Sequence, residues 1–202
     1  DAYCEKSLEF VKNNKDNPDD NGDKKENLNI AKYTLKDIIS TIETMNVTDL
    51  QFLLDAADIN KKSAVKAMEK QEITFGRAME EQWNSNIDFP HSAMLKANKY
   101  ISCASEGRMR GLKIPIMSLT NSGNKGITNF LGVLAVAETL KVSKEKFAKA
   151  LALSTAITIY VKNYINEVSA VCGGVFASSS GVAAATVYLL DGEYDDMINA
   201  MN

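Results

Sequence analysis

Apolar side chains recur every three or four residues along much of this chain, which is the spacing of helices that bury one face. No long stretch alternates between apolar and polar residues in the way of a half-buried strand. The first clear stripe predicts a helix over 35–45 and is formed by Leu35, Ile38, Ile39, Ile42 and Met45. The pattern therefore predicts a mainly α-helical fold.

Three more helices are predicted before residue 110. Thr48 and Gln51 have the spacing of a capping box, so we expect a long helix that follows them and ends near Gln71. A shorter helix is expected over 75–83. After a break at 86–90, another helix reaches about residue 105, with Asp88 or Ser92 as its cap.

The second half contains three strongly apolar stretches, at 126–140, 143–165 and 168–190, and Ser143 is a candidate N-cap for the second. The third has no charged residue and is long enough to span a bilayer. Its serines and the Gly173-Gly174 pair favour a helix packed tightly inside the protein over a membrane helix. We therefore predict a compact all-α domain with a buried, Gly/Ala/Ser-rich central helix at 168–190.

Composition also divides the chain into two parts. The run 12–27 has no apolar side chain except Pro18, so we interpret residues 1–28 as the end of a preceding element plus a polar linker. Residues 29–202 form the helical domain. Because the sequence starts at Asp1 and stops at Asn202 without a visible stop signal, we expect a piece of a longer protein.

Charge and cysteine content exclude several classes of function. With 23 basic and 26 acidic residues the net charge is −3, which gives no strong positive field for nucleic acid. Three cysteines do not indicate a disulfide framework, and they fit a reducing, cytoplasmic setting. Nine of the 11 glycines lie between Gly107 and Gly192, in the half of the chain with few charges, so chemistry is expected there.

The turn Ser122-Gly123-Asn124-Lys125-Gly126 precedes an apolar helix. Glycines at a helix N-terminus leave N–H groups able to face a carboxylate or phosphate. An ordinary polar turn is the alternative. Arg108 and Arg110 are candidates for clamping a carboxylate, with surface ion pairs as the other interpretation.

Cys172 lies beside Gly173 and Gly174, and paired glycines in a helical run indicate that something needs the space. A buried, inert thiol is the alternative. Ser154, Thr158 and Lys162 follow at i+4 spacing and share one helix face, which either lines a polar pocket or reaches water at its end. His91 is the only histidine, which excludes mechanisms that need two imidazoles.

Five blocks occur in one order at 107–118, 122–128, 150–154, 158–162 and 169–173, including Ser122-Gly123-Asn124-Lys125-Gly126-Ile127-Thr128 and Ser169-Ala170-Val171-Cys172-Gly173. In these blocks the chain resembles the C-terminal helical half of the iron–sulfur-dependent L-serine dehydratase alpha-chain and L-cysteine desulfidase family. The resemblance implies a lyase that converts a β-substituted L-amino acid into pyruvate and ammonia.

The same resemblance implies roles for individual residues. A [4Fe–4S] cluster is expected in the complete protein, with Cys172 as its first cysteine ligand. The segment 122–126 would bind substrate, and Lys162 and Thr158 would line the same cavity as catalytic residues. Partners implied are a small amino-acid substrate and the remainder of the protein or a second subunit, with a homodimer as a further alternative and neither nucleic acid nor membrane.

Departures from the family pattern limit what this chain does alone. A Cys-Asp-Gly-Ala-Lys type motif with the other cluster cysteines is expected after Asn202, and an N-terminal Gly-Cys-Thr-Glu-Pro segment is absent. Thr155 stands at a position where the family commonly has histidine, and Lys125 stands where the family frequently has glutamine or histidine. We therefore expect this chain alone to be inactive and without a complete cluster. A non-catalytic small-molecule-binding or assembly module is the alternative function.

Overall fold

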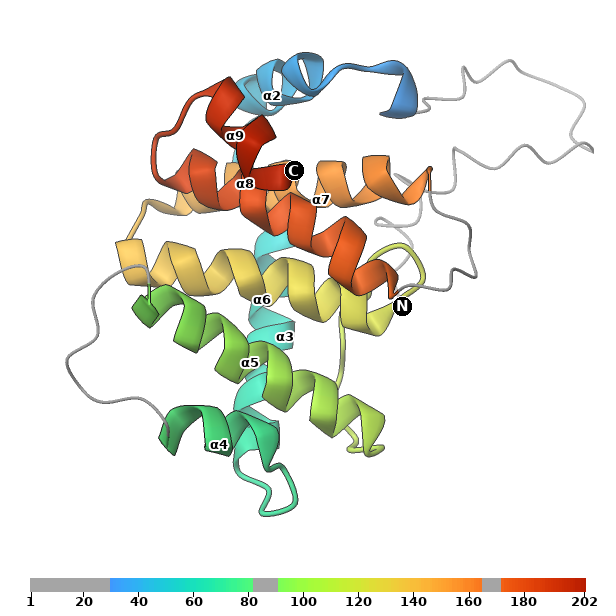
Figure 1. The fold of residues 1–202 in the computed structure, drawn as a ribbon, viewed down its shortest axis with the longest axis vertical. Helices are drawn as coiled ribbons and strands as arrows, with labels where there is room; N and C mark the ends of the chain where they lie inside the picture. Colours follow the sequence, from blue (N-terminus) through green and yellow to red (C-terminus); the bar gives the residue numbers. More distant parts are fainter. Residues whose placement is uncertain (1–29, 82–90, 165–171) are drawn as a thin grey trace, which may run out of the picture.

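The structure is a computed structural model that describes residues 30–81, 91–164 and 172–202. Within these residues the chain forms eight α-helices and two short helical turns, and no extended strand (Figure 1). The elements are η1 (Ile30–Lys32), α2 (Leu35–Thr44), α3 (Gln51–Met68), α4 (Phe75–Glu81), α5 (His91–Met109), α6 (Gly123–Leu140), α7 (Lys144–Lys162), η2 (Gly174–Ser178), α8 (Ser179–Leu189) and α9 (Tyr194–Met201). The predicted all-α fold is confirmed.

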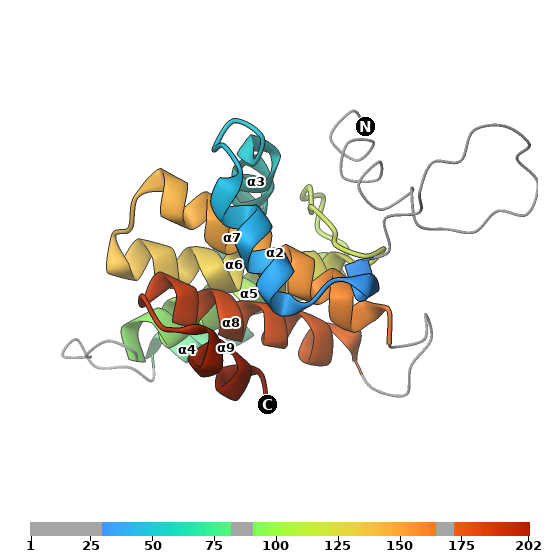
Figure 2. The same cartoon turned by 90° about the horizontal axis from the view of Figure 1, so that it is seen from above.

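Helix α6 is the centre of the molecule. It packs against α5, α7 and α8, and α3 crosses behind this set (Figures 1 and 2). Every residue from Phe130 to Ala137 is buried. Helices α2 and α9 lie on the outside, where α2 packs on α7 and α9 packs on α8. Helix α6 therefore carries much of the buried core, and the segment 122–126, which the sequence predicts to bind substrate, lies at its N-terminal end.

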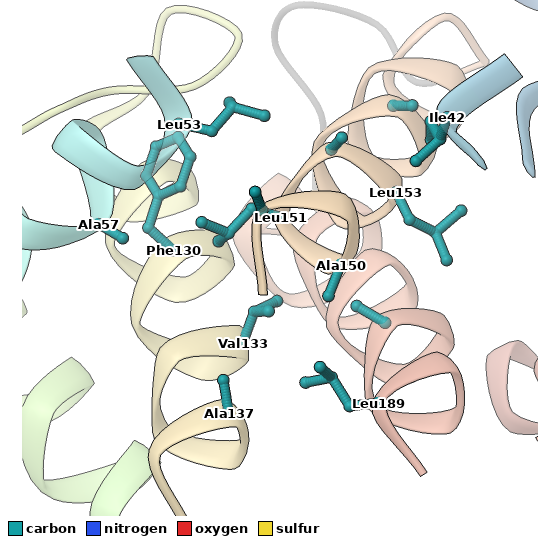
Figure 3. Close-up of a cluster of buried hydrophobic side chains, with 14 of the residues drawn as sticks. Ile42, Leu53, Ala57, Phe130, Val133, Ala137, Ala150, Leu151, Leu153 and Leu189 are labelled. Atoms are coloured by element: carbon teal, nitrogen blue, oxygen red, sulfur yellow. The ribbon is translucent and has the colours of Figure 1, made fainter. Parts of the chain in front are cut away.

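The main apolar core joins helices that are distant in sequence. Figure 3 shows Leu53 of α3, Phe130 and Val133 of α6, and Leu151 of α7 pointing into one cluster, with Leu189 of α8 at its edge. Leu151 and Val133 are fully enclosed. Burying side chains of this size stabilises the fold by roughly 1.5–3 kcal/mol each, so this cluster fixes the order of the helices around α6.

The predicted central helix at 168–190 differs from the structure over the residues that the structure describes. Residues 165–171 lie outside the described part, and from Gly174 onward the segment is broken into a π-helical turn and α8. In α8 only Gly181, Ala184, Ala185 and Leu189 are buried. Small side chains let this segment approach α7 closely, but α6 covers more of the core because its larger apolar residues face neighbours on several sides.

Helix starts agree with the sequence at some positions and differ at others. Ser143 caps α7 as predicted, accepting a hydrogen bond from Lys146 N at 3.2 Å. The Thr48–Gln51 capping box is wrong, because α3 begins after Leu50 without a side-chain cap. Ser92 lies inside α5. Capping boxes form instead between Thr34 and Asp37 at α2 and between Glu193 and Asp196 at α9.

Several predictions concern segments outside the described residues, namely the linker 1–28, Trp83, the break at 86–90 with Asp88, and Ser169. Helix α9 was not predicted. Within the described ranges, no helix is both long enough and apolar enough to cross a membrane.

Candidate functional site

The chain reverses direction immediately before α6. Leu119 and Ser122 exchange backbone hydrogen bonds of 3.1 Å, and the two residues between them, Thr120 and Asn121, have φ values of 45° and 59°. Left-handed backbone is unfavourable for the β-branched Thr120 and is often found at functional sites. Ser122 then caps α6, accepting a hydrogen bond from Lys125 N at 3.4 Å. The glycine turn predicted at 122–126 is therefore the first turn of a helix.

The segment before this turn is held by α3. Asn60 is fully buried, and its side chain accepts from Met117 N at 2.8 Å and donates to Met117 O at 3.1 Å. One turn later, Ser63 donates to Pro115 O at 2.5 Å. On the other side, a Cβ at Gly126 would lie 2.0 Å from Met117 O, so only glycine allows α6 to come this close. The turn is thus fixed between α3 and α6.

Arg108 joins the same site from the end of α5. Its side chain lies against Gly123, where a Cβ would be 2.4 Å from Arg108 Nε, and it donates to Asn124 Oδ1 at 3.1 Å. Arg110 points elsewhere and pairs with Glu106 at 2.9 Å. Of the two arginines considered, only Arg108 contacts the predicted substrate-binding turn.

Lys125 is buried, with 8% of its surface exposed. Its ammonium donates to both the carbonyl and the hydroxyl oxygen of Thr120, at 3.3 and 3.1 Å. Burial and the positive charge of Lys162 lower the pKa of Lys125, and the nearby Cys172 partly opposes this shift. The sequence did not reveal that Lys125 stabilises the strained turn that precedes its own helix.

Cys172 has an exposed thiol. A Cβ placed on Gly174 would lie 3.5 Å from Cys172 Sγ and 4.0 Å from Lys125 N, so both atoms are within 4 Å of one point. A Cβ on Gly173 would lie 2.9 Å from Lys125 Cε. Gly173 therefore makes room for the Lys125 side chain. Cys172 therefore lies near the turn at 122–126, and Cys103 is the buried cysteine of the described residues.

Lys162 and Thr158 lie on one face of α7 but in different surroundings. Lys162 is half-buried in the last turn of α7. Thr158 is fully buried, and its hydroxyl oxygen lies 3.0 Å from Asn129 Oδ1 and 2.8 Å from Ser154 O. Thr158 thus belongs to the core between α6 and α7, one turn below Lys162.

Asn129 is the centre of that buried polar network and was missed in the sequence. Its Oδ1 also accepts from Ser154 Oγ at 2.5 Å, and its Nδ2 donates to Thr155 Oγ1 at 3.1 Å. Asn129 lies one turn after Lys125 on α6, so the network fixes the register between α6 and α7. The sequence did contain one signal of this network, namely an asparagine within an otherwise apolar helix, because a buried polar side chain needs hydrogen-bond partners.

These residues make a small positively charged site around the start of α6. Arg108, Lys125 and Lys162 contribute cations, α6 contributes its N-terminal N–H groups, and Cys172 contributes a thiol. Such a site is suited to an anionic ligand. Among the described residues, no three His, Cys, Asp or Glu side chains lie close enough together to hold a metal ion.

A groove of about 650 Å³ lies elsewhere, between α2 and the α8–α9 corner, where Ile39, Tyr188 and Met197 line it. Its charged side chains are already engaged, with Glu43 accepting from Tyr188 at 2.7 Å and Lys146 paired with Asp191 at 2.6 Å. None of the predicted site residues lines this groove.

Comparison with known proteins shows the family of the chain. The profile of the serine dehydratase alpha chain family matches residues 13–202. The chain belongs to this family. It is 43% identical over 169 residues to a UPF0597 protein of Methanocella arvoryzae, a match that covers 84% of this chain and 40% of that protein. No solved structure matches the chain significantly.

Other members of the family show the same partial coverage. A UPF0597 protein of Clostridioides difficile is 36% identical over 165 residues, covering 79% of this chain and 37% of that protein. One from Clostridium botulinum is 33% identical over 172 residues, covering 85% and 39%. The chain therefore spans about two fifths of the length of these curated relatives.

Proposed function

We propose that this chain is the helical part of an iron–sulfur-dependent, cytoplasmic lyase that deaminates L-serine or desulfurises L-cysteine. The products are pyruvate and ammonia, with sulfide in addition from cysteine. Membership of the serine dehydratase alpha chain family supports the reaction class. The observation that carries the proposal is the meeting of the exposed Cys172 thiol with the buried Lys125 at the N-terminus of α6.

The substrate carboxylate is assigned to the start of α6. Ser122, Gly123, Asn124 and Gly126 place the first-turn backbone of α6, and Arg108 adds a guanidinium beside it. Helix N-termini and guanidinium groups both favour a carboxylate. Lys125 reinforces this preference through its charge, while its hydrogen bonds to Thr120 keep the turn in place.

Proton transfer is assigned to Lys162, because it lies in the last turn of α7 close enough to act on Lys125; its amine, in the neutral form, would accept the α-proton. Removing the α-proton and the β-hydroxyl or β-thiol from the amino acid gives an enamine, which tautomerises and is hydrolysed to pyruvate and ammonia. Thr158 is buried behind Lys162, so its contribution would be to hold α7 against Asn129.

The residues present fit one corner of a [4Fe–4S] cluster. Cys172 is exposed and can bind iron as a thiolate, and the surrounding cations suit a cluster whose thiolate ligands make it anionic. The other cysteine ligands must come from outside the described residues. When bound, the cluster would supply an open iron that acts as a Lewis acid on the leaving group.

The test uses a chimera of the Methanocella arvoryzae relative in which this chain replaces the matched segment. After anaerobic reconstitution with iron and sulfide, we expect visible absorption from the cluster and pyruvate from L-serine or L-cysteine. Cys172→Ser should abolish both. Cys103→Ala is the matched control, because Cys103 is buried beside Gly76 between α4 and α5, and alanine removes its thiol without burying a new polar group.

A chimera that carries a stoichiometric cluster but forms pyruvate from neither amino acid would overturn the proposed reaction. That result would favour the non-catalytic binding module. Retention of the cluster in Cys172→Ser would refute the ligand assignment. Stable cluster incorporation by the chain alone would contradict the expectation that its own residues cannot complete the site.

A further inference from the structure

Exposed apolar side chains surround the candidate site. Met109, Tyr164, Val175 and Phe176 are 69%, 67%, 61% and 52% exposed. We call these four residues the apolar rim. Single exposed hydrophobic residues are common on protein surfaces, but a group of them beside a functional site indicates an interaction surface.

The four residues lie on three segments that meet at one end of the molecule. Figures 1 and 2 show the start of α6, the end of α7 and η2 at the same end. The end of α5 joins them because Arg108, the neighbour of Met109, donates to Asn124. Turn η2 is tied to α6 by a 3.2 Å hydrogen bond from Ser178 Oγ to Lys125 O, and it also packs on α7. The apolar rim therefore borders the site on several sides.

The charge of the same segments is one-sided. Segments 107–126, 158–164 and 172–181 contain no aspartate or glutamate; apart from Arg110, which pairs with Glu106, their cations are Arg108, Lys113, Lys125 and Lys162. The neighbouring carboxylate of Glu106 is turned away and accepts from the backbone of Thr74 and Phe75. A partner for this surface is expected to combine apolar side chains with negative charge.

The relatives provide such a partner within their own polypeptide, because about three fifths of their length lies outside the part that matches this chain. We propose that the apolar rim is the docking surface for that remaining polypeptide, which closes over the start of α6. This docking proposal rests on the proposed function in one respect only: the docked polypeptide would bring the other cluster ligands to Cys172.

The experiment measures side-chain oxidation by hydroxyl radicals, residue by residue, with mass spectrometry. It compares the chain alone with the Methanocella arvoryzae chimera described above, without reconstituting any cluster. We expect Met109, Tyr164 and Phe176 to be oxidised at least fivefold more slowly in the chimera. Met94, near the other end of α5 from Met109, and Phe75 of α4 are 48% and 66% exposed; they are matched controls and should react equally in both proteins.

A second measurement uses Phe176→Glu in the chimera, which should restore oxidation of Met109 and Tyr164 to the rate seen in the chain alone. Phe75→Glu should not. Equal oxidation of the apolar rim in both proteins would overturn the proposal. So would protection already present in the chain alone, because the chain itself, or a second copy if the protection depended on concentration, would then cover the surface. Neither readout depends on catalysis, so the lyase assignment can fail while this proposal stands.

Discussion

Removal of the Asn60 side chain is the sharpest test of how the site is held. Asn60 is fully buried on α3, and its amide makes both hydrogen bonds to the backbone of Met117, 57 residues away. In Asn60→Ala these two backbone groups lose their partner. An unsatisfied buried polar group costs about 1–3 kcal/mol. Because two backbone groups lose their partner but Met117 is only half-buried, we expect a loss of about 2–4 kcal/mol in the free energy of unfolding.

Asn60→Asp separates the two hydrogen bonds. The carboxylate still accepts from Met117 N but cannot donate to Met117 O, and it brings a charge into the interior. Burial raises the pKa of such a carboxyl above its unfolded value. The destabilisation should therefore be full above the native pKa and shrink as the pH falls toward the unfolded value of about 4, because the protonated acid can donate again.

The assay is urea unfolding followed by far-UV circular dichroism, with linear extrapolation to water. Lys62→Ala is the matched control, since Lys62 lies on the same helix with a 75% exposed side chain and only a surface ion pair to Asp58. It should cost less than about 0.5 kcal/mol. If Asn60→Ala were no more destabilising than Lys62→Ala, the idea that α3 fixes the turn before α6 would be refuted.

Two further predictions concern other parts of the fold. Burial raises the pKa of Glu106, but the N–H groups of Phe75 and Thr74 and the Arg110 guanidinium outweigh it and hold the pKa below its ordinary value of 4.5. Glu106→Gln should therefore cost about 1–3 kcal/mol at pH 7, and the difference in urea unfolding should shrink as the pH falls through that native pKa; a difference independent of pH would contradict this. Gly181→Ala should cost about 1–3 kcal/mol, because its Cβ would lie 2.4 Å from Ser154 O. Gly111→Ala, at φ 79° with open space around it, should lose only about 1 kcal/mol, and equal thermal midpoints for the two variants would refute the contact.

Local patterns in the sequence predicted much of the helical structure. The stripe from Leu35 to Ile42 forms α2, and Ser143 caps α7, because both depend on neighbours within a few residues. The position of each helix within the fold was harder to predict from the sequence. The charge-free stretch 168–190 looked central, yet α6 is the enclosed helix, since burial depends on which faces other helices cover.

The site divides in the same way. The closeness of Arg108 and Cys172 to the start of α6 agrees with the sequence prediction, but the helix begins at Gly123, within the segment that was predicted to be a turn. Asn60 and Asn129 were not predicted, because their partners lie 57 and 25 to 29 residues away. Contacts between residues so far apart produce no repeating pattern in the sequence. The left-handed Thr120 was also unpredictable, since its conformation is held by a lysine that follows five residues later.

The passage of Lys125 across Gly173 restricts which sequences this protein can explore. A methyl group at position 173 would meet the lysine stem at 2.9 Å and push its ammonium off Thr120. Because Cε lies near the end of a flexible side chain, the lysine would move aside at little cost in packing, and the loss would fall on its hydrogen bonds to Thr120. Selection for an intact turn before α6 would therefore couple positions 125 and 173, whereas selection for folding alone would not.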